Sequence, residues 1–429
     1  MIVIVSDTKS NRLNYICNFL FREQLGLEYI IRNDIHHQHI EEGSYLFNYT
    51  EKKIESEAFR LKPVGLLTEK NIRKQHINVF EKKEYKAFFK IEDSDFDFDI
   101  LSAIFFLISR YEEYLPHEKD MYGRFSHDQS VAYKNDFLHL PLVNSWLNDF
   151  ADCLQKKIPF LKITRPPFEY IPTYDVDMAW SFKKKGVLRN IGGFISSPSL
   201  QRIRVVLGKE KDPFDCYEFL DDLHHKKNLA PVYFFLTAEQ RGKYDKNISP
   251  HKRSMKRLIK KISENSRIGI HPSWKSNETV SILKREKKIL EIISQQSVVL
   301  SRQHYIKLKL PHTFENLIEA GITEDYSMGY GSINGFRASV ASSFLWYNLE
   351  KEEETSLRLF PFCFMDANAH FEQKQNAEIS FDELMRYYQV CKEANGMFIT
   401  IFHNYMLGTD KHFEGWKNLY QHFIAQIRQ

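Results

Sequence analysis

Apolar residues recur along the chain with two periods, and the two periods alternate. The first run, "MIVIVSD", is continuous and of strand length. In the segment that follows, Leu13, Ile16 and Phe19 are spaced as on one face of a helix, and Gly26 is a typical stop signal. This pattern predicts a strand followed by a helix, which is the opening of an α/β unit.

The next stretch continues this unit and ends in two helices. Short apolar runs at "YIIRND", "GSYLFNYT" and "PVGLL" predict further strands. After them, "ILSAIFFLISRYEEYL" and "PLVNSWLNDFADCLQKKI" show helical spacing. We expect a smaller N-terminal α/β domain over residues 1–160, of unknown role, whose last helices bridge to a second domain over residues 161–429.

From residue 166 onward, apolar runs of strand length alternate with helical segments such as "SILKREKKILEIISQ". These runs are "FEYIPTYDVD", "APVYFFLT", "SRIGIHPS", "QSVVLSRQHY", "GITEDYS", "GFRAS", "LRLFPFCFMD" and "MFITIFHN". Repeated strand-then-helix units predict a parallel sheet, because parallel strands need a crossover connection. About seven such units predict an α/β fold of the (β/α)7-like barrel type.

Composition narrows the class of protein. Apolar residues make up 43% of the 429 positions and charged residues 27%, as in a soluble globular protein. The formal net charge of +4 is nearly balanced, so no nucleic-acid partner is implied. The five cysteines form no CxxC pair and fit a reducing compartment. We find no signal peptide and no integral membrane segment, and we expect a cytoplasmic location. "HHQH" at 36–39 is interpreted as a solvated loop.

Most of the predicted strands end in side chains that bind metals or move protons. They are Asp175, Asp177, His271, Arg302, His304, Asp325, Asp366 and His403. Any one of them alone would be interpreted as a cap or turn residue. In a parallel barrel, however, the carboxyl ends of all strands meet at one face, so these groups should converge. A carboxylate with two imidazoles is a common ligand set for catalytic zinc, and a second carboxylate can act as a base beside it.

The order of these motifs resembles the polysaccharide deacetylase family, also called the NodB-homology domain or carbohydrate esterase family 4. The likeness covers residues 165–429. "TYDVD" is similar to the first family motif, which implies that Asp175 is the catalytic base and Asp177 a metal ligand. "GIHPSWK" resembles the second motif and supplies His271 as a ligand, but Lys275 stands where the family has a second histidine. The wording also resembles a Bacteroidetes-type branch with an added N-terminal domain.

The remaining motifs complete the resemblance with one substitution. "RQHY" is similar to the third motif, which implies that Arg302 orients the base. His304 replaces the proline of that motif, and we hypothesise that it restores the missing metal ligand; a histidine merely hydrogen-bonded to its neighbours is the alternative. The fourth family motif carries an aspartate that holds the catalytic histidine, and Asp325 stands at the corresponding place. Asp366 could do the same job. "IFH" implies that His403 is the general acid.

The resemblance implies a metal-dependent hydrolase that removes an N-acyl group, typically acetyl, from an amino sugar or glycan precursor. Its cofactor would be a divalent metal ion, zinc or else cobalt or nickel. Two alternatives stay open: a hydrolase of the same fold acting on a non-sugar amide, and a degenerate barrel that binds glycan without turnover. Arg337 in "GFRAS" is either an anion-binding residue or part of a structural ion pair. The oligomeric state is left open.

Overall fold

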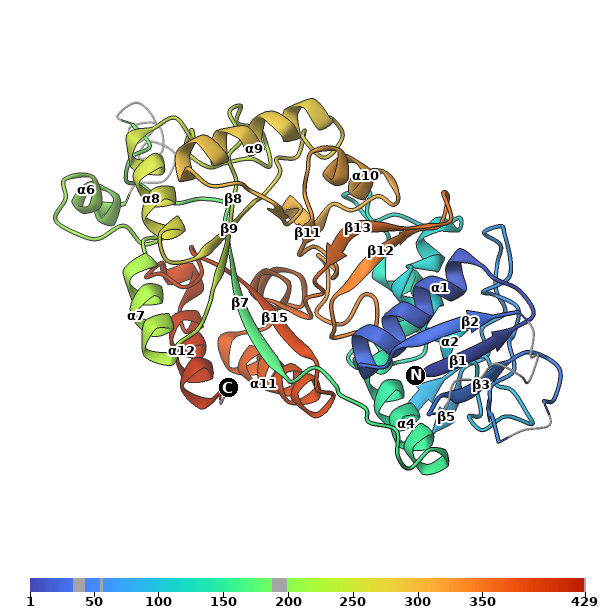
Figure 1. Ribbon diagram of the computed structural model, residues 1–429. Helices are drawn as coiled ribbons and strands as arrows, with labels where there is room; N and C mark the ends of the chain where they lie inside the picture. Colours follow the sequence, from blue (N-terminus) through green and yellow to red (C-terminus); the bar gives the residue numbers. More distant parts are fainter. Residues whose placement is uncertain (34–42, 55–56, 187–198, 428–429) are drawn as a thin grey trace.

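The computed structural model describes residues 1–33, 43–54, 57–186 and 199–427. "HHQH" at 36–39 lies outside the described residues. The described chain contains two larger sheets, one formed by residues before position 61 and one formed by residues after position 168 (Figure 1). A small antiparallel pair, β5 and β6, makes a third.

The first sheet is parallel throughout, with strand order β2-β1-β3-β4. The Ser10 side chain accepts a hydrogen bond from the Leu13 N–H and so begins the first helix where the sequence predicts it. The elements of this part are β1 (Ile2–Ser6), α1 (Asn11–Cys17) with a π-helical continuation (Asn18–Gln24), β2 (Tyr29–Arg32), β3 (Tyr45–Tyr49), β4 (Phe59–Arg60), β5 (Phe80–Lys82), β6 (Tyr85–Ala87), α2 (Ile100–Ile108), α3 (Val131–Lys134) and α4 (Leu142–Lys157). The strand predicted at "PVGLL" is wrong, because Gly65 has a φ of +96° and opens a turn there.

The second sheet has nine strands in the order β12-β13-β11-β10-β9-β8-β7-β15-β14, and every ladder except β12 with β13 is parallel. Helices lie outside it, as Figure 1 shows for α7, α8, α9, α11 and α12. The elements are β7 (Glu169–Val176), α6 (Leu200–Val206), α7 (Tyr217–Lys227), β8 (Val232–Phe235), α8 (Arg253–Ser263), β9 (Arg267–Ile270), α9 (Val280–Ser294), β10 (Leu300–Ser301), α10 (His312–Glu319), β11 (Glu324–Asp325), β12 (Phe344–Asn348), β13 (Glu353–Leu359), β14 (Phe364–Met365), α11 (Ala377–Glu393), β15 (Met397–His403) and α12 (Trp416–Gln426). The predicted α/β class with a parallel strand array is therefore confirmed.

Two details of this sheet differ from the expectation. "GFRAS" is not a strand: Gly335 has a φ of +142° and the Phe336 N–H bonds to the Leu138 carbonyl, which pulls the segment toward the N-terminal part. The antiparallel edge strand β12 was not predicted. Among the described residues no ladder joins the edge strands β12 and β14, so hydrogen bonds do not close the array into a ring.

The longest ladder of the large sheet joins its first and last strands in sequence. β7 and β15 pair in parallel over seven positions, ending with His403 opposite Asp175. Both strands are apolar and buried almost throughout, as expected for a sheet covered on both faces. Two residues that are 228 positions apart in sequence therefore lie side by side at the carboxyl edge.

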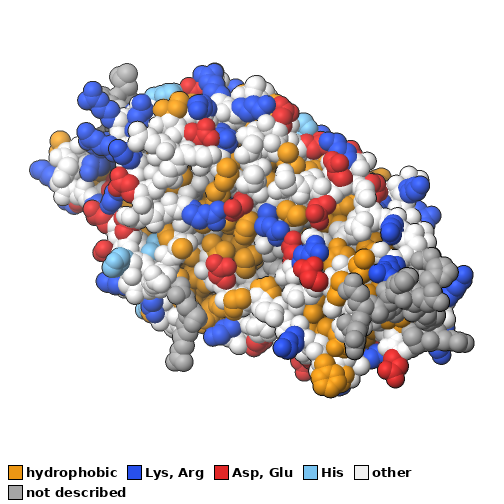
Figure 2. All heavy atoms as spheres, in the orientation of Figure 1, with side chains coloured by type: hydrophobic (Ala, Val, Ile, Leu, Met, Phe, Trp, Pro, Cys, Tyr) orange, Lys and Arg blue, Asp and Glu red, His pale blue; other side chains and the backbone are white. Residues whose placement is uncertain are grey.

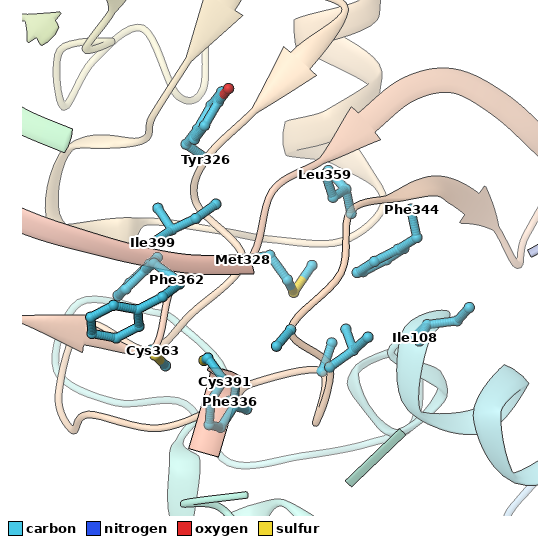
Figure 3. Packing of buried hydrophobic residues seen from close by; sticks show 14 of the residues in the cluster. Ile108, Tyr326, Met328, Phe336, Phe344, Leu359, Phe362, Cys363, Cys391 and Ile399 are labelled. Atoms are coloured by element: carbon cyan, nitrogen blue, oxygen red, sulfur yellow. The ribbon is translucent and has the colours of Figure 1, made fainter. Parts of the chain in front are cut away.

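The two parts of the chain share one hydrophobic core. Ile108 of α2 belongs to the same buried cluster as Phe344 and Leu359 of the large sheet (Figure 3). The contact also has ionic components, since Arg12 pairs with Glu352. The N-terminal part is thus packed against the large sheet by apolar and charged contacts together.

The outer surface carries both signs of charge. In the view of Figure 2, Lys and Arg side chains gather at the end of the molecule that bears α6 and α8, while acidic groups are scattered. Within the described residues, every helix is too short or too polar to span a lipid bilayer.

Candidate metal centre and active site

Side chains from four strand ends converge on one point at the carboxyl edge of the large sheet. Asp177 follows β7, His271 follows β9, His304 comes shortly after β10, and His403 ends β15. The Asp177 carboxylate lies at the centre: His271 Nε2 is 3.1 Å from its Oδ1, while His304 Nε2 and His403 Nε2 are 3.7 and 3.6 Å from its Oδ2. Parallel strands thus bring these distant residues together, as the sequence predicts.

Asp177, His271 and His304 form a group suited to holding a metal ion. One ligand atom from each lies within 4.8 Å of the others, and this is the single such group of three among the described residues. Asp177 Oδ1 is buried and has no hydrogen-bond donor of suitable geometry among the described residues; His271 Nε2, 3.1 Å away, carries no proton when the ring is neutral and Nδ1 donates to the Arg302 carbonyl. A buried carboxylate oxygen without a donor is costly, and a bound cation would satisfy it. The donor set therefore fits a divalent ion such as zinc.

Hydrogen bonds fix which ring nitrogen of each histidine faces the site. His271 Nδ1 donates to the Arg302 carbonyl over 2.6 Å, and His304 Nδ1 donates to the Asp245 carboxylate over 3.1 Å. Both Nε2 atoms are left facing Asp177, which is the orientation that a metal ligand needs. Burial alone would raise the pKa of Asp177, but His304 and His271 hold it well below its usual range. Asp177 and Asp245 raise the pKa of His304 to about 9 against the effect of burial.

Lys275, at the position of the missing family histidine, takes no part in this group. It is exposed, and its Nζ points to the Gln240 side chain at 3.4 Å. His304 instead supplies the second imidazole, from the turn after β10. The structure thus brings His304 to the place that the sequence hypothesis gives it.

Asp175 and Arg302 form a buried pair beside the metal-ligand group. Arg302 Nη1 donates to Asp175 Oδ1 over 2.9 Å, and Arg302 Nε donates to the Tyr326 carbonyl over 3.0 Å. The guanidinium lies over the Phe234 ring, 4.4 Å from its centroid. The other Asp175 oxygen is 3.8 Å from His271 Nε2 and borders the cavity described below. One carboxylate oxygen is therefore held by Arg302, and the other is left for chemistry.

His403 is held by Asp366 and not by Asp325. Asp366 Oδ1 accepts from His403 Nδ1 over 2.6 Å, and its Oδ2 accepts from the His403 N–H over 2.7 Å. Burial lowers the tendency of His403 to be charged, but Asp366 and Asp177 raise its pKa to about 9. The imidazole is therefore protonated at neutral pH, with Nε2 toward Asp177.

The role predicted for Asp325 is corrected accordingly. Its carboxylate accepts hydrogen bonds from the Ser301 hydroxyl, the Ser327 hydroxyl and the Ser327 N–H, all on its own side of the sheet. Burial raises its pKa to about 6, although these bonds and the nearby Arg302 oppose the shift. Because β10, β9, β8 and β7 lie between β11 and β15 in the sheet, Asp325 lies away from His403 and does not hold it.

A cavity of about 310 Å³ opens beside the metal-ligand group. Residues from the N-terminal part and from six segments of the part that forms the large sheet line it. They are Tyr122, Arg124, Asp175, Asp177, His271, Gln303, His304, Tyr305, Ile306, Gly331, Met365, Ala367, Asn368, Phe371, Glu372, His403 and Tyr405. Its volume suits a single sugar ring or another group of that size.

Of the aromatic residues near the motifs, Tyr305 lines the cavity and Trp274 stacks on the neighbouring Tyr244. Tyr326 and Tyr330 are core residues, and Trp180 lies away from the cavity. Arg337 is also structural, because it makes a buried ion pair with Glu113.

The sequence patterns did not predict three residues at or beside the site, namely Asp245, Tyr122 and Arg124. Asp245 lies in "RGKYDKNIS", a polar loop without the strand-then-acid pattern that marks the other site residues. Tyr122 and Arg124 lie in the segment "DMYGRF", some fifty residues before the first strand of the large sheet. Only the tertiary contact between the two parts brings them to the site.

Comparisons with known proteins match one family model and several solved structures. Residues 2–159 match a family of unknown function, DUF7033, and no curated protein matches the chain. Among solved structures, a Mycobacterium smegmatis protein assigned to the polysaccharide deacetylases is 13% identical over 61% of this chain and 84% of its own, with a TM-score of 0.41. A polysaccharide deacetylase of Bacillus cereus is 9% identical over 61% of this chain and 88% of its own, with a TM-score of 0.31.

A further similar structure is a carbohydrate esterase family 4 pseudoenzyme of Bacillus anthracis. It is 10% identical over 60% of this chain and 61% of its own, with a TM-score of 0.32.

Proposed function

We propose that the protein is a metal-dependent hydrolase that removes an N-acyl group, such as acetyl, from an amino sugar or glycan precursor. The observation that carries the proposal is that four kinds of group line one wall of the cavity. They are the Asp177 carboxylate, which has an oxygen without a donor; the oriented imidazoles of His271 and His304; the Asp175 carboxylate held by Arg302; and the His403 imidazolium held by Asp366. This set contains a metal-ligand group, a base and an acid, which are the parts that amide hydrolysis needs.

Asp177, His271 and His304 would hold the ion, with zinc as the first candidate and cobalt or nickel as the others. When bound, such an ion supplies a Lewis acid for the acyl carbonyl and makes a neighbouring water more acidic. The two imidazoles present Nε2 and keep Nδ1 engaged with the Arg302 carbonyl and Asp245. They therefore need no rearrangement to become ligands.

Asp175 would accept the proton of the attacking water. Arg302 donates to one of its oxygens, so the other oxygen is left beside the cavity that Asp175 lines. His403 would donate a proton from Nε2 to the departing nitrogen, since Asp366 holds its Nδ1 and keeps the ring charged. The acid and the base lie opposite each other on adjacent strands.

The experiment is to load the purified protein with zinc and offer it N-acetylated amino sugars, their oligomers, and linear and cyclic amides without a sugar. The expected result is release of acetate from the sugars, at a rate that Asp175→Asn lowers by about 10²-fold or more. Activity on the other amides alone would replace the sugar substrate by a non-sugar amide. Zinc binding without turnover on any of them would indicate a binding protein.

A further inference from the structure

A loop from the N-terminal part reaches the candidate active site, and its shape is fixed locally. Lys119 and Phe125 form an antiparallel bridge at its base. The Asp120 carboxylate accepts from the N–H of Tyr122, from the N–H of Arg124 and from Arg124 Nε, over 2.9, 3.0 and 2.6 Å. Gly123, with a φ of +78°, allows the turn between them. The segment "DMYGR" therefore specifies a rigid loop tip.

From this tip, Arg124 donates a hydrogen bond to the turn that carries His304. Its Nη1 donates to the Tyr305 carbonyl over 2.5 Å, and its side chain is buried. Tyr305 and Ile306 have φ values of 58° and 50°, a left-handed conformation that is unfavourable for residues with side chains. Such a turn persists only when its surroundings hold it, and Arg124 is the buried donor on its carbonyl.

Gly331 keeps the path of this contact open. A Cβ at that position would lie 2.0 Å from Arg124 Nη1 and 2.9 Å from the Tyr305 carbonyl oxygen. No side chain fits there without displacing the guanidinium. The large sheet is thus shaped to admit an arginine from the other part of the chain.

Tyr122 lies on the same loop and faces the cavity. Its ring centroid is 5.2 Å from that of Tyr305 and 6.2 Å from that of Trp274, and Arg124 lies over its face. Tyr122 and Tyr305 line the cavity together with Asp177 and His304. An aromatic wall beside the reacting groups is suited to packing against the apolar face of a ring.

We propose that the loop from Lys119 to Phe125 is a working part of the active site. Arg124 is a positioning residue that aims His304 through the Tyr305 carbonyl, and Tyr122 contacts the substrate and contributes to its selection. The segment that matches a family of unknown function would thus serve to complete the site of the large sheet. The role of Tyr122 rests on the proposed function, whereas that of Arg124 requires only metal binding.

The Arg124 role is tested by zinc affinity, measured by competition with a chelator and needing no substrate. We expect Arg124→Ala and Gly331→Ala to weaken zinc binding about 10- to 100-fold, as the loss of a group that orients a ligand typically does. As a control, Arg73→Ala removes only an exposed ion pair with Glu69 and should bind zinc as the unmodified protein does. If Arg124→Ala does not fold, Asp120→Asn loosens the same arginine. Unchanged affinity in folded Arg124→Ala or Asp120→Asn overturns the positioning role.

The Tyr122 role is tested by steady-state kinetics on an N-acetylated amino-sugar oligomer. We expect Tyr122→Ala to raise KM about three- to tenfold while kcat changes little, and Tyr122→Phe, which keeps the ring, to match the unmodified protein. An unchanged KM in Tyr122→Ala overturns the substrate contact. If the zinc-loaded protein hydrolyses no N-acyl sugar, the proposed function and the Tyr122 role both fail. The zinc affinities still judge Arg124 in that case.

Discussion

The clusters around Glu113 and Asp177 both bury ionised side chains, but only around Glu113 does every carboxylate oxygen have a donor. Glu113 Oε1 accepts from Arg110 and Arg337, and its Oε2 accepts from Arg337. Burial opposes ionisation, yet these two arginines lower the pKa of Glu113 to about 2. Asp177 Oδ1 has no donor among the described residues, and the carboxylate borders a cavity.

This difference separates a structural ion pair from a site built for a ligand. The Glu113 cluster joins the N-terminal part to the large sheet and leaves nothing for a ligand to satisfy. The Asp177 cluster leaves one carboxylate oxygen without a donor, and this carboxylate lines the cavity. A buried carboxylate oxygen without a hydrogen-bond donor is therefore a better indicator of function than the presence of buried charges alone.

The sharpest way to test the comparison is to separate the two carboxylates of the open cluster. We expect Asp175→Asn to lower kcat roughly 10²- to 10⁴-fold while zinc affinity stays near that of the unmodified protein, because a proposed base is lost and the ligands remain. Asp177→Asn should lose zinc and activity together. Metal analysis beside the kinetics distinguishes them, and loss of zinc in Asp175→Asn would contradict the division of roles.

Changes in the Glu113 cluster should alter the stability of the protein and leave zinc binding unchanged. We expect Glu113→Gln to lower the free energy of unfolding by about 3–5 kcal/mol, since two buried arginines lose their shared charged acceptor. Chemical denaturation measures this, and Glu69→Gln, which alters an exposed pair, should change it by less than about 1 kcal/mol. The comparison breaks if Glu113→Gln leaves stability intact but abolishes zinc binding.

Asp366 shares a feature with each cluster. Both of its carboxylate oxygens have a donor, as in Glu113, but the donor is His403, the proposed catalytic acid beside Asp177. Asp366 raises the pKa of His403 against the effect of burial, and His403 must be protonated to act as an acid, so kcat should fall as pH rises through the pKa that His403 has in the zinc-loaded protein. Asp366→Asn removes the largest charge that raises this pKa. We expect the alkaline limb of the kcat profile to move to lower pH and kcat at neutral pH to fall roughly tenfold or more. A profile that keeps its position would argue against His403 as the acid.

The open cluster should also release a proton when it binds a metal ion. Before an ion binds, His304 has a pKa of about 9 and is protonated at neutral pH, whereas a ligand imidazole must be neutral. Zinc affinity should therefore rise about tenfold per pH unit between about pH 6 and 8. Asp245→Asn, which removes one carboxylate from His304, should flatten this dependence at its upper end. Affinity independent of pH would exclude His304 as a ligand.

The sequence predicted the strand ends at this site, but not the order of the strands. β7 and β15 are long and apolar, so Asp175, Asp177 and His403 could be assigned to strand ends from the pattern alone. The sequence also predicts strands at β10, β11 and β14, which have only two residues each in the structure, but it does not give the order of these strands in the sheet. The acid that holds His403 therefore could not be chosen between Asp325 and Asp366, because the choice depends on the order of strands in the sheet.

Residues that act across the two parts were beyond any pattern in the sequence. Asp245 lies in an irregular loop, and Arg337 could be assigned to a structural pair only once Glu113 was seen beside it. Arg124 and Tyr122 follow no strand at all. Periodicity describes how a segment packs against its own sheet, and it carries no information about a loop arriving from another part of the chain.

The ladder between β7 and β15 has a consequence for how such a protein diversifies. Because Asp175 and His403 are register partners, the spacing of the proposed base and acid is set by backbone hydrogen bonds, about 4.8 Å between strands, and not by loops. Insertions and exchanges in the loops around the cavity can then alter which molecule enters without disturbing the proton-transfer groups. A stable chemistry with replaceable surroundings is a favourable starting point for new substrate ranges, whether natural or designed.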